Sequence, residues 1–124
     1  MNTKLLRSWI FFLATLLLSF GVFARGPVLL EQVSVENLPA QARQTLVLIK
    51  QGGPFPYARD GAVFGNYEGI LPHRKRGYYR EYTVKTPGVR SRGARRIVSG
   101  GNPSWSGEYY YTEDHYATFK RIKE

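Results

Sequence analysis

The chain has 124 residues, a formal net charge of +9 and no cysteine. It has room for one domain, and disulfides, thiol nucleophiles and cysteine-ligated zinc sites are excluded. With two histidines and no cluster of acids, the composition also argues against a metal site. A small domain this basic favours polyanionic partners, namely nucleic acid, anionic lipid or an acidic protein.

The first 24 residues predict a secretory signal peptide. Lys4 and Arg7 precede an apolar run over residues 9–20, and small or aliphatic residues stand at the cleavage-determining positions up to Ala24. The alternative is a membrane anchor, but the stretch ending at Ala24 has 16 residues, fewer than the roughly 20 that a spanning helix needs. Cleavage after Ala24 would leave residues 25–124 as one domain with a charge of +7, because Lys4 and Arg7 are removed and no acid is.

Residues 38–50 predict a helix, because their apolar side chains recur at helical spacing and form a single stripe. Pro39 suits the first helical turn, and Gly52 suits the C-terminal cap. The polar segment before the helix holds one edge segment around residues 29–35. We expect the helix to pack on a sheet and to take no part in the chemistry.

Several short segments that follow the helix have strand character, since they are rich in Tyr, Thr, Val and Ile. They are residues 62–64, 78–84, 94–98, 108–112 and 116–122. One helix followed by sequential strands with short connections predicts an α+β domain, in which an N-terminal helix packs on a four- to five-stranded antiparallel sheet. We expect the tyrosines at 109–111 and Trp105 to pack in the sheet. The alternative is that their rings are platforms on which bases stack.

The segment 78–98 contains five arginines, whereas Glu81 is the only carboxylate between Gly69 and Gly107. Because side chains alternate faces along a strand, an antiparallel pair of strands can place Glu81 and Arg96 on one face. Neighbouring guanidiniums would keep Glu81 ionised. A carboxylate base beside cations for phosphoryl oxygens suits the chemistry of a phosphodiester. The alternative is an ion pair on a basic surface.

His115 follows Asp114 at a predicted bend. An imidazole near neutral pH can donate a proton to a leaving oxygen, which neither Glu81 nor an arginine does well. The alternative is a solvated surface histidine. His73 lies among Arg74, Lys75 and Arg76 and is interpreted as a surface residue.

The loop 64–68 combines flexible backbone with aromatic rings and one acid. A glutamate accepts hydrogen bonds from a base edge with adjacent N–H donors, and guanine offers N1–H and N2–H₂ together. Backbone N–H groups can donate to O6, and an aromatic ring can stack on the base. The alternative is an ordinary loop with a capping glutamate.

Taken together, these residues resemble the guanyl-specific microbial ribonucleases. The chain looks closest to the small secreted streptomycete-type enzymes and is more distantly similar to barnase, binase and the fungal guanyl ribonucleases. The likeness covers about residues 38–120. Its most specific motifs are G-P-F-P-Y at 53–57, D-G-x-V-F-x-N-x-E at 60–68, G-Y-Y-x-E-Y-T-V at 77–84, T-P-G-x-R-x-R-G-x-R-R-I at 86–97 and D-H-Y-A-T-F at 114–119.

The resemblance implies a role for each of five residues at the reacting phosphate. Glu81 would be the general base that takes the proton of the ribose 2′-OH, and His115 the general acid that protonates the departing 5′-oxygen. Arg92 and Arg96 would hold the scissile phosphate and stabilise its charge in the transition state. Tyr116 would contribute a phenol to the phosphate.

The resemblance also implies a guanine pocket formed by Phe64, Asn66, Tyr67 and Glu68, in which Glu68 reads N1–H and N2–H₂. Gly65 stands where streptomycete-type relatives carry a larger polar residue. Tyr67 replaces their arginine and is similar to the tyrosine that stacks over the base in the fungal loop. The basic loop 71–77 and the loop 100–107 have no assigned counterpart in these relatives.

The implied activity is that of a secreted endoribonuclease cutting single-stranded RNA 3′ to guanosine without a metal or cofactor. Cleavage would pass through a 2′,3′-cyclic phosphate, which is then hydrolysed to a 3′-phosphate. The alternative is a non-catalytic cationic protein on the same fold that binds RNA or membranes. The resemblance further implies a monomer without stable membrane association after signal cleavage, and an acidic inhibitor protein similar to barstar.

Overall fold

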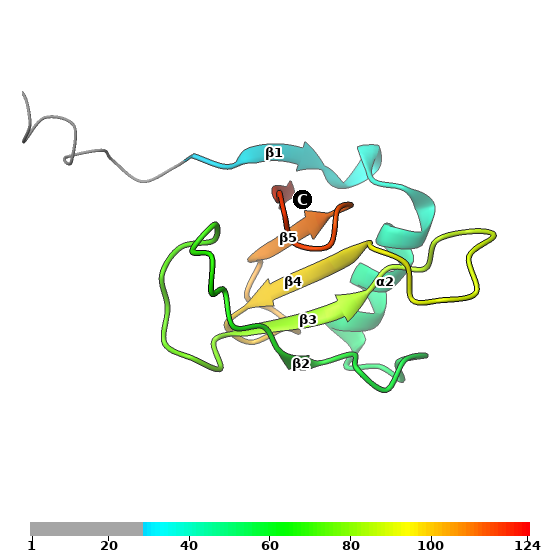
Figure 1. Cartoon of the computed structure of the whole chain (residues 1–124), viewed down its shortest axis with the longest axis horizontal. Coiled ribbons are helices and arrows are strands. Elements are labelled where there is room, and N and C mark those ends of the chain that lie inside the picture. The colour runs from blue at the N-terminus through cyan, green and yellow to red at the C-terminus, as the bar shows by residue number, and fades with distance from the viewer. Residues whose placement is uncertain (1–28) are drawn as a thin grey trace, which may run out of the picture.

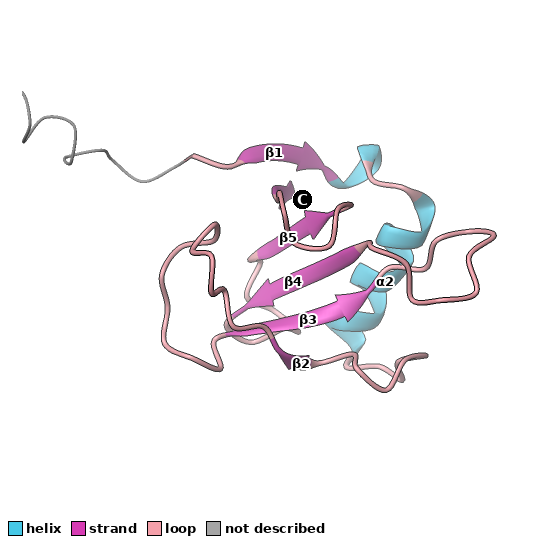
Figure 2. Cartoon of the chain, viewed as in Figure 1, coloured by secondary structure: helices cyan, strands magenta, loops and turns pink. Residues whose placement is uncertain are grey.

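A computed structural model describes residues 29–124, so the predicted signal peptide lies outside the described residues. One helix, α2 (Ala40–Gln51), packs on one face of a six-stranded sheet (Figures 1 and 2). A short 3-10 helix, η1 (Val35–Asn37), precedes it. The strands, in sheet order, are β1 (Glu31–Ser34), β6 (Lys120–Lys123), β5 (Tyr109–Thr112), β4 (Arg96–Gly100), β3 (Tyr79–Thr83) and β2 (Ala62–Val63). Within residues 29–124 no helix has the length and apolar character needed to cross a membrane.

The predicted α+β class is confirmed, but the sheet has six strands instead of four or five, and one strand pair is parallel. β1 runs parallel to β6, with Glu31 beside Lys120 and Ser34 beside Lys123, while the other neighbouring pairs are antiparallel. The additional strand is the edge segment predicted around residues 29–35. Its pairing depends on where the C-terminal strand lies in space, which no local sequence pattern reveals.

Two strands, β6 and β4, begin later than predicted. β6 begins at Lys120 instead of Tyr116, and β4 begins at Arg96 instead of Ala94. His115 and Tyr116 have positive φ angles of 54° and 74°, which a strand does not accommodate. Residues 113–119 are therefore a loop between β5 and β6.

The two faces of the sheet have different functions because strand side chains alternate. The face covered by α2 holds the main core, in which Leu46 and Ile49 of the helix join Tyr82 and Ile97 of the sheet. The helix ends at Gly52, whose φ of 80° is left-handed, as predicted for its C-terminal cap. The opposite face holds a smaller apolar cluster of Leu71, Tyr79, Val98, Tyr110 and Phe119. Polar side chains beside this cluster form the candidate site.

The tyrosines at 109–111 pack in the sheet as predicted, each being at most 3% exposed. The same prediction is wrong for Trp105, which is 77% exposed in the loop between β4 and β5. This loop is held to the sheet by Glu108, whose carboxylate accepts hydrogen bonds from the hydroxyls of Tyr78 at 2.6 Å and Tyr110 at 2.7 Å. The loop is thus anchored without its tryptophan.

Candidate active site

Glu81 lies in the middle of β3 on the face opposite α2 and is only 5% exposed. Two guanidiniums face its carboxylate: Arg92 Nη2 lies 3.3 Å and Arg59 Nε 3.8 Å from Oε1. Burial of an unpaired carboxylate is strongly unfavourable, whereas cationic partners offset much of the desolvation cost. The Glu81 carboxylate is therefore held, paired with cations, on the sheet face that α2 does not cover.

Arg92 reaches Glu81 from the loop between β3 and β4 because Thr83 orients it. The Nε and Nη2 atoms of Arg92 donate to Thr83 Oγ1 at 3.0 and 2.7 Å. In the antiparallel register, Thr83 lies opposite Arg96 and Glu81 lies opposite Val98. Glu81, Thr83 and Arg96 therefore share one face, as the alternation of side chains predicts.

Arg96 is 2% exposed and supports the loop that precedes β4. Its Nη1 donates to the carbonyl oxygens of Gly93 at 3.0 Å and Arg95 at 2.7 Å. The buried Nε has no hydrogen-bond partner among the described residues. An unpaired buried donor in a native protein calls for an explanation, and a bound anion would supply the missing acceptor.

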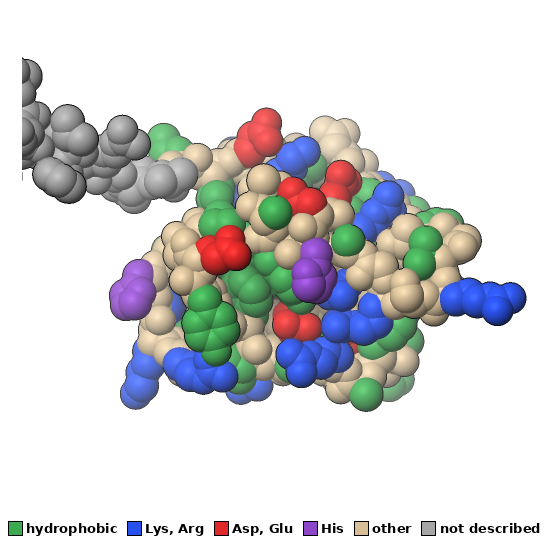
Figure 3. All heavy atoms as spheres, viewed as in Figure 1, with side chains coloured by type: hydrophobic (Ala, Val, Ile, Leu, Met, Phe, Trp, Pro, Cys, Tyr) green, Lys and Arg blue, Asp and Glu red, His purple; other side chains and the backbone are tan. Residues whose placement is uncertain are grey.

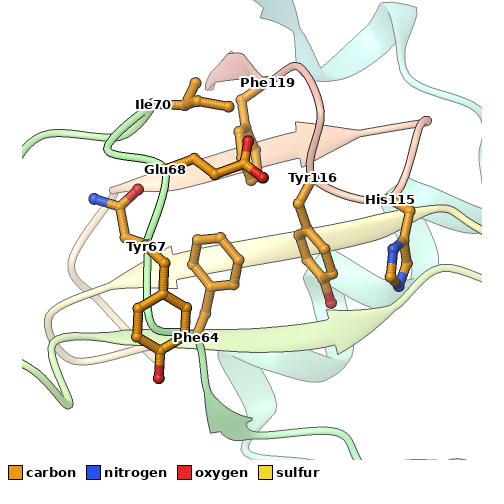
Figure 4. Close-up of a pocket in the computed structure, with 8 residues that line it drawn as sticks. Phe64, Tyr67, Glu68, Ile70, His115, Tyr116 and Phe119 are labelled. Atoms are coloured by element: carbon orange, nitrogen blue, oxygen red, sulfur yellow. The ribbon is translucent and has the colours of Figure 1, made fainter.

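Tyr116 connects this charged cluster to His115. Burial and the negative charge of Glu81 raise the pKa of the Tyr116 phenol to about 12, although Arg96 acts in the opposite direction. The guanidinium carbon of Arg96 lies 6.0 Å from the centre of the Tyr116 ring. The rings of His115 and Tyr116 are 4.8 Å apart, and Figure 4 shows both at one end of a pocket. The structure thus places Glu81, Arg96 and His115 beside Tyr116, and Arg92 beside Glu81.

The loop 113–119 is held in place by Asp114. The carboxylate of Asp114 accepts hydrogen bonds from the Thr118 hydroxyl at 2.6 Å, the Thr118 N–H at 2.9 Å and the Thr112 hydroxyl at 2.8 Å. The His115 N–H donates to the carbonyl of Ala94 at 3.0 Å. These bonds attach the histidine both to the end of β5 and to the segment that precedes Arg96.

Asp114→Asn is expected to weaken this loop in a pH-dependent way. The Thr118 hydroxyl, followed by other hydrogen bonds, lowers the pKa of Asp114 to about 2. A carboxyl with a depressed pKa stabilises the fold above its ordinary pKa of about 4 and loses that contribution as the pH falls toward about 2. The difference in Tm between the wild type and Asp114→Asn should therefore shrink over this interval. Thermal unfolding from pH 5 to pH 2 measures it, and a constant difference would contradict the assignment.

A pocket of about 280 Å³ lies beside His115 and Tyr116 (Figure 4). All four residues predicted to bind a base contribute to its lining, which consists of Phe64, Asn66, Tyr67, Glu68, Ile70, His115, Tyr116 and Phe119. The rings of Phe64 and Tyr116 are stacked with centres 4.9 Å apart. Glu68 extends over the pocket toward Phe119. An aromatic surface and a carboxylate therefore face one cavity.

Asn66 shapes the loop instead of presenting its amide to the pocket. The Asn66 Nδ2 donates to the carbonyl of Leu71 at 2.9 Å, and its Oδ1 accepts the N–H of Leu71 at 3.1 Å. Its φ is 51°, and the three non-glycine residues with positive φ within residues 29–124 are Asn66, His115 and Tyr116. All three line the pocket. Such backbone conformations concentrate at functional sites.

Tyr67 is 86% exposed and lies against Gly65. A Cβ added at Gly65 would meet the Tyr67 ring at 2.5 Å, closer than Cβ contacts in proteins occur. The Tyr67 hydroxyl accepts a hydrogen bond of 2.7 Å from Arg76 Nη1. Gly65 and Tyr67 are therefore a matched pair, because the absence of a Cβ at Gly65 leaves room for the ring.

Two residues of the site, Arg59 and Thr83, were not among the predicted site residues. Arg59 comes near Glu81 because β2 pairs with β3 so that Ala62 lies opposite Glu81. An arginine three residues before that position could have been found by pairing the short strand at 62–63 with β3. Strand alternation places Thr83 on the face of Glu81, but its role in holding Arg92 depends on the path of a loop.

The whole face combines charge, acid–base groups and an apolar floor. Figure 3 shows a hollow with hydrophobic side chains at its floor and with Lys and Arg side chains along its lower edge. Within residues 29–124, no group of three His, Cys, Asp or Glu side chains is placed to hold a metal ion. The groups that are present can move protons through Glu81 and His115 and can stabilise an anion through Arg92 and Arg96.

Comparison with known proteins points to one family. A family model described as ribonuclease matches residues 27–123. Guanyl-specific ribonuclease Sa3 of Kitasatospora aureofaciens is 57% identical over 91 residues, which cover 73% of this chain and 62% of that protein. Guanyl-specific ribonuclease St of Saccharopolyspora erythraea is 57% identical over 90 residues, or 73% of this chain and 85% of that protein. The chain thus matches less than two thirds of the length of Sa3.

A solved structure agrees with these relatives in fold. The crystal structure of ribonuclease Sa2 with guanosine-2′-cyclophosphate is 50% identical in sequence and has a TM-score of 0.70. The match covers 77% of this chain and 97% of that one. The family model, the sequence identities and the fold are in agreement, and the chain belongs to the streptomycete-type branch of the guanyl-specific microbial ribonucleases.

Proposed function

We propose that this protein is an endoribonuclease that cleaves single-stranded RNA 3′ to guanosine. The observation that carries the proposal is the arrangement of one face, on which a buried carboxylate between guanidiniums lies next to a pocket shared by His115 and the loop 64–68. Membership in the guanyl-specific family supports the same activity.

In the first step, Glu81 takes the proton of the ribose 2′-OH, and the 2′-oxygen attacks the adjacent phosphorus. The bond to the 5′-oxygen of the next nucleotide breaks as His115 protonates that oxygen, leaving a 2′,3′-cyclic phosphate. Arg92 and the unpaired Nε of Arg96 stabilise the negative charge on the phosphoryl oxygens. Tyr116, with a pKa of about 12, remains a neutral hydrogen-bond donor at neutral pH.

In the second step, water attacks the cyclic phosphate while Glu81 and His115 exchange their acid and base roles, which yields a 3′-phosphate. RNA carries its own nucleophile, so the protein needs neither a metal ion nor a nucleophilic side chain. DNA lacks the 2′-OH and is not a substrate.

Guanine is read by Glu68, whose carboxylate accepts hydrogen bonds from N1–H and N2–H₂. Phe64 and Tyr67 provide ring surfaces for stacking, and both line the pocket. Asn66 contributes by holding the loop through Leu71, so that backbone N–H groups can face O6 of the base.

The proposal includes a cellular setting, which rests on the signal-peptide pattern of residues 1–24. The chain is exported, signal cleavage after Ala24 leaves residues 25–124, and the enzyme acts outside the cytoplasm as a monomer without stable membrane association. Its positive charge of +7 would also attract an acidic inhibitor protein.

Incubation of the protein with the dinucleoside phosphate GpU in EDTA tests the function. We expect cleavage to guanosine 2′,3′-cyclic phosphate, followed by guanosine 3′-phosphate, with no cleavage of the 2′-deoxyguanosine analogue. Chromatographic separation of the products measures both steps. RNA binding without any cleavage would instead support a cationic binding protein on the same fold.

Glu68→Ala tests the base pocket separately from the catalytic groups. Loss of a bidentate acceptor should reduce the preference for GpU over ApU by about 5- to 150-fold, since such a pair contributes about 1–3 kcal/mol of discrimination. Values of kcat/KM for GpU, ApU and CpU measure the preference, and the Kd for inorganic phosphate serves as the control. Equal losses for all three substrates would refute the role of Glu68 in base recognition.

A further inference from the structure

A second pocket, of about 390 Å³, opens on the other side of the loop 64–69. Tyr67 lines both this pocket and the proposed guanine pocket, so the loop forms a wall between them. All four basic residues of the loop 71–77 line the second pocket: His73, Arg74, Lys75 and Arg76. No catalytic or base-reading role has been assigned to any of them.

The cations of this pocket lack carboxylate partners within residues 29–124. None of the ion pairs there includes Arg74, Lys75 or Arg76. Instead, Arg74 lies over the ring of Tyr78 at 5.2 Å, and Arg76 lies over the ring of Tyr67 at 5.9 Å. Three consecutive cations at one pocket repel one another, and a bound anion would relieve that repulsion.

The position of the pocket indicates which anion it suits. The segment between β2 and β3 leaves one end of the sheet, and the loop with Arg92 leaves the opposite end (Figure 1). The proposed guanine pocket lies between this segment and this loop, with His115 at one end of the pocket and Tyr67 at the other (Figure 4). An RNA substrate with its scissile phosphate near Arg92 and its guanine in the pocket has its 3′ side at the catalytic end. The 5′ side of the RNA is then directed toward the basic loop 71–77.

We propose that the second pocket is a phosphate subsite that binds a phosphodiester on the 5′ side of the guanosine. This inference rests on the proposed function, because the position of the guanosine sets the direction of the strand. Arginine and lysine both bind phosphate oxygens through charge-assisted hydrogen bonds. Arg76 also holds Tyr67, so the wall between the two pockets is tied to the subsite.

The double variant Arg74→Gln/Lys75→Gln tests the subsite without disturbing the bond from Arg76 to Tyr67. The substrates are GpU, UpUpGpU with a 5′ extension and GpUpUpU of the same length with a 3′ extension. In the variant, the ratio of kcat/KM for UpUpGpU to that for GpU should fall roughly 3- to 10-fold, since two cations no longer attract the 5′ phosphates. The ratio for GpUpUpU to GpU should stay constant.

A matched control removes two charges elsewhere, through Lys120→Gln/Lys123→Gln, because both lysines are exposed residues of β6. This control should leave the UpUpGpU ratio unchanged. An unchanged ratio in Arg74→Gln/Lys75→Gln would overturn the proposal. A fall of equal size for both tetranucleotides, or in the control variant, would also overturn it, because the effect would then be general attraction of RNA.

Binding of UpUp(dG)pU, in which the guanosine is replaced by 2′-deoxyguanosine, tests the subsite independently of the proposed enzyme activity. The missing 2′-OH prevents cleavage, so only binding is measured. The slope of log Kd against log salt concentration should decrease by about 0.7 for each phosphate that the variant no longer neutralises. Absence of GpU cleavage by the wild type would refute the enzyme, whereas an unchanged salt slope would refute only the subsite.

Discussion

Glu81→Gln is expected to lower kcat/KM for GpU by a factor of about 10²–10⁴, the usual contribution of a general base. Glutamine has the shape of glutamate and can still accept a hydrogen bond from Arg92, which lies 3.3 Å from the carboxylate in the wild type. It cannot take a proton from the 2′-OH. The variant therefore keeps the shape of the side chain and removes its negative charge and its basicity.

Initial rates at saturating and limiting GpU in EDTA measure this effect, with formation of the cyclic phosphate followed directly. Glu36→Gln is the matched control, because Glu36 is an exposed acid in η1, on a different part of the protein. Thermal unfolding of Glu81→Gln checks that the loss of a buried charge between Arg59 and Arg92 leaves the protein folded. Undiminished cleavage by folded Glu81→Gln would refute the role of this residue as the base.

His115→Asn is expected to lower kcat for GpU by a similar factor of about 10²–10⁴, because the 5′-oxygen would leave without a proton. Asparagine is the best replacement because it tolerates a left-handed backbone, and His115 has a φ of 54°. The hydrogen bond from the backbone of residue 115 to Ala94 is also retained. Any decrease in rate then reports on the imidazole.

A substrate with a good leaving group distinguishes proton donation from positioning. Guanosine 3′-(p-nitrophenyl phosphate) releases a phenolate that needs no proton, so His115→Asn should cleave it at nearly the wild-type rate. Release of the phenolate is followed by absorbance. Equal decreases with GpU and with this substrate would show that His115 positions the phosphate and is not the acid.

The two predictions concern side chains on different kinds of element: Glu81 lies in a strand and His115 in a loop. The position of Glu81 on one face with Thr83 and Arg96 could be predicted from the sequence, because alternation along a strand is a local property. The register then confirmed it, with Thr83 opposite Arg96. The loop around His115 was predicted less well, because Tyr116 was assigned to a strand that begins only at Lys120.

The helix followed the same local logic. Its apolar stripe and its capping glycine predicted an element over residues 38–50, and the observed helix is Ala40–Gln51 with Gly52 in a left-handed conformation. The resemblance to a known family added the proposed base-binding loop, whose four predicted residues all line one pocket. Several motifs in a fixed order along the chain identify such a loop, because many positions then match the family together.

By itself, the sequence determined the class of the fold, the face that carries Glu81 and Arg96, and the family, because strand alternation, helical periodicity and motif order are written along the chain. Only the tertiary structure decided the parallel pairing of β1 with β6, the approach of Arg59 to Glu81 and the position of Tyr67 on Gly65 under Arg76. Most of these contacts join segments far apart in the chain, and the last depends on the path of a loop. Their geometry follows from how the whole chain packs, and no local pattern encodes it.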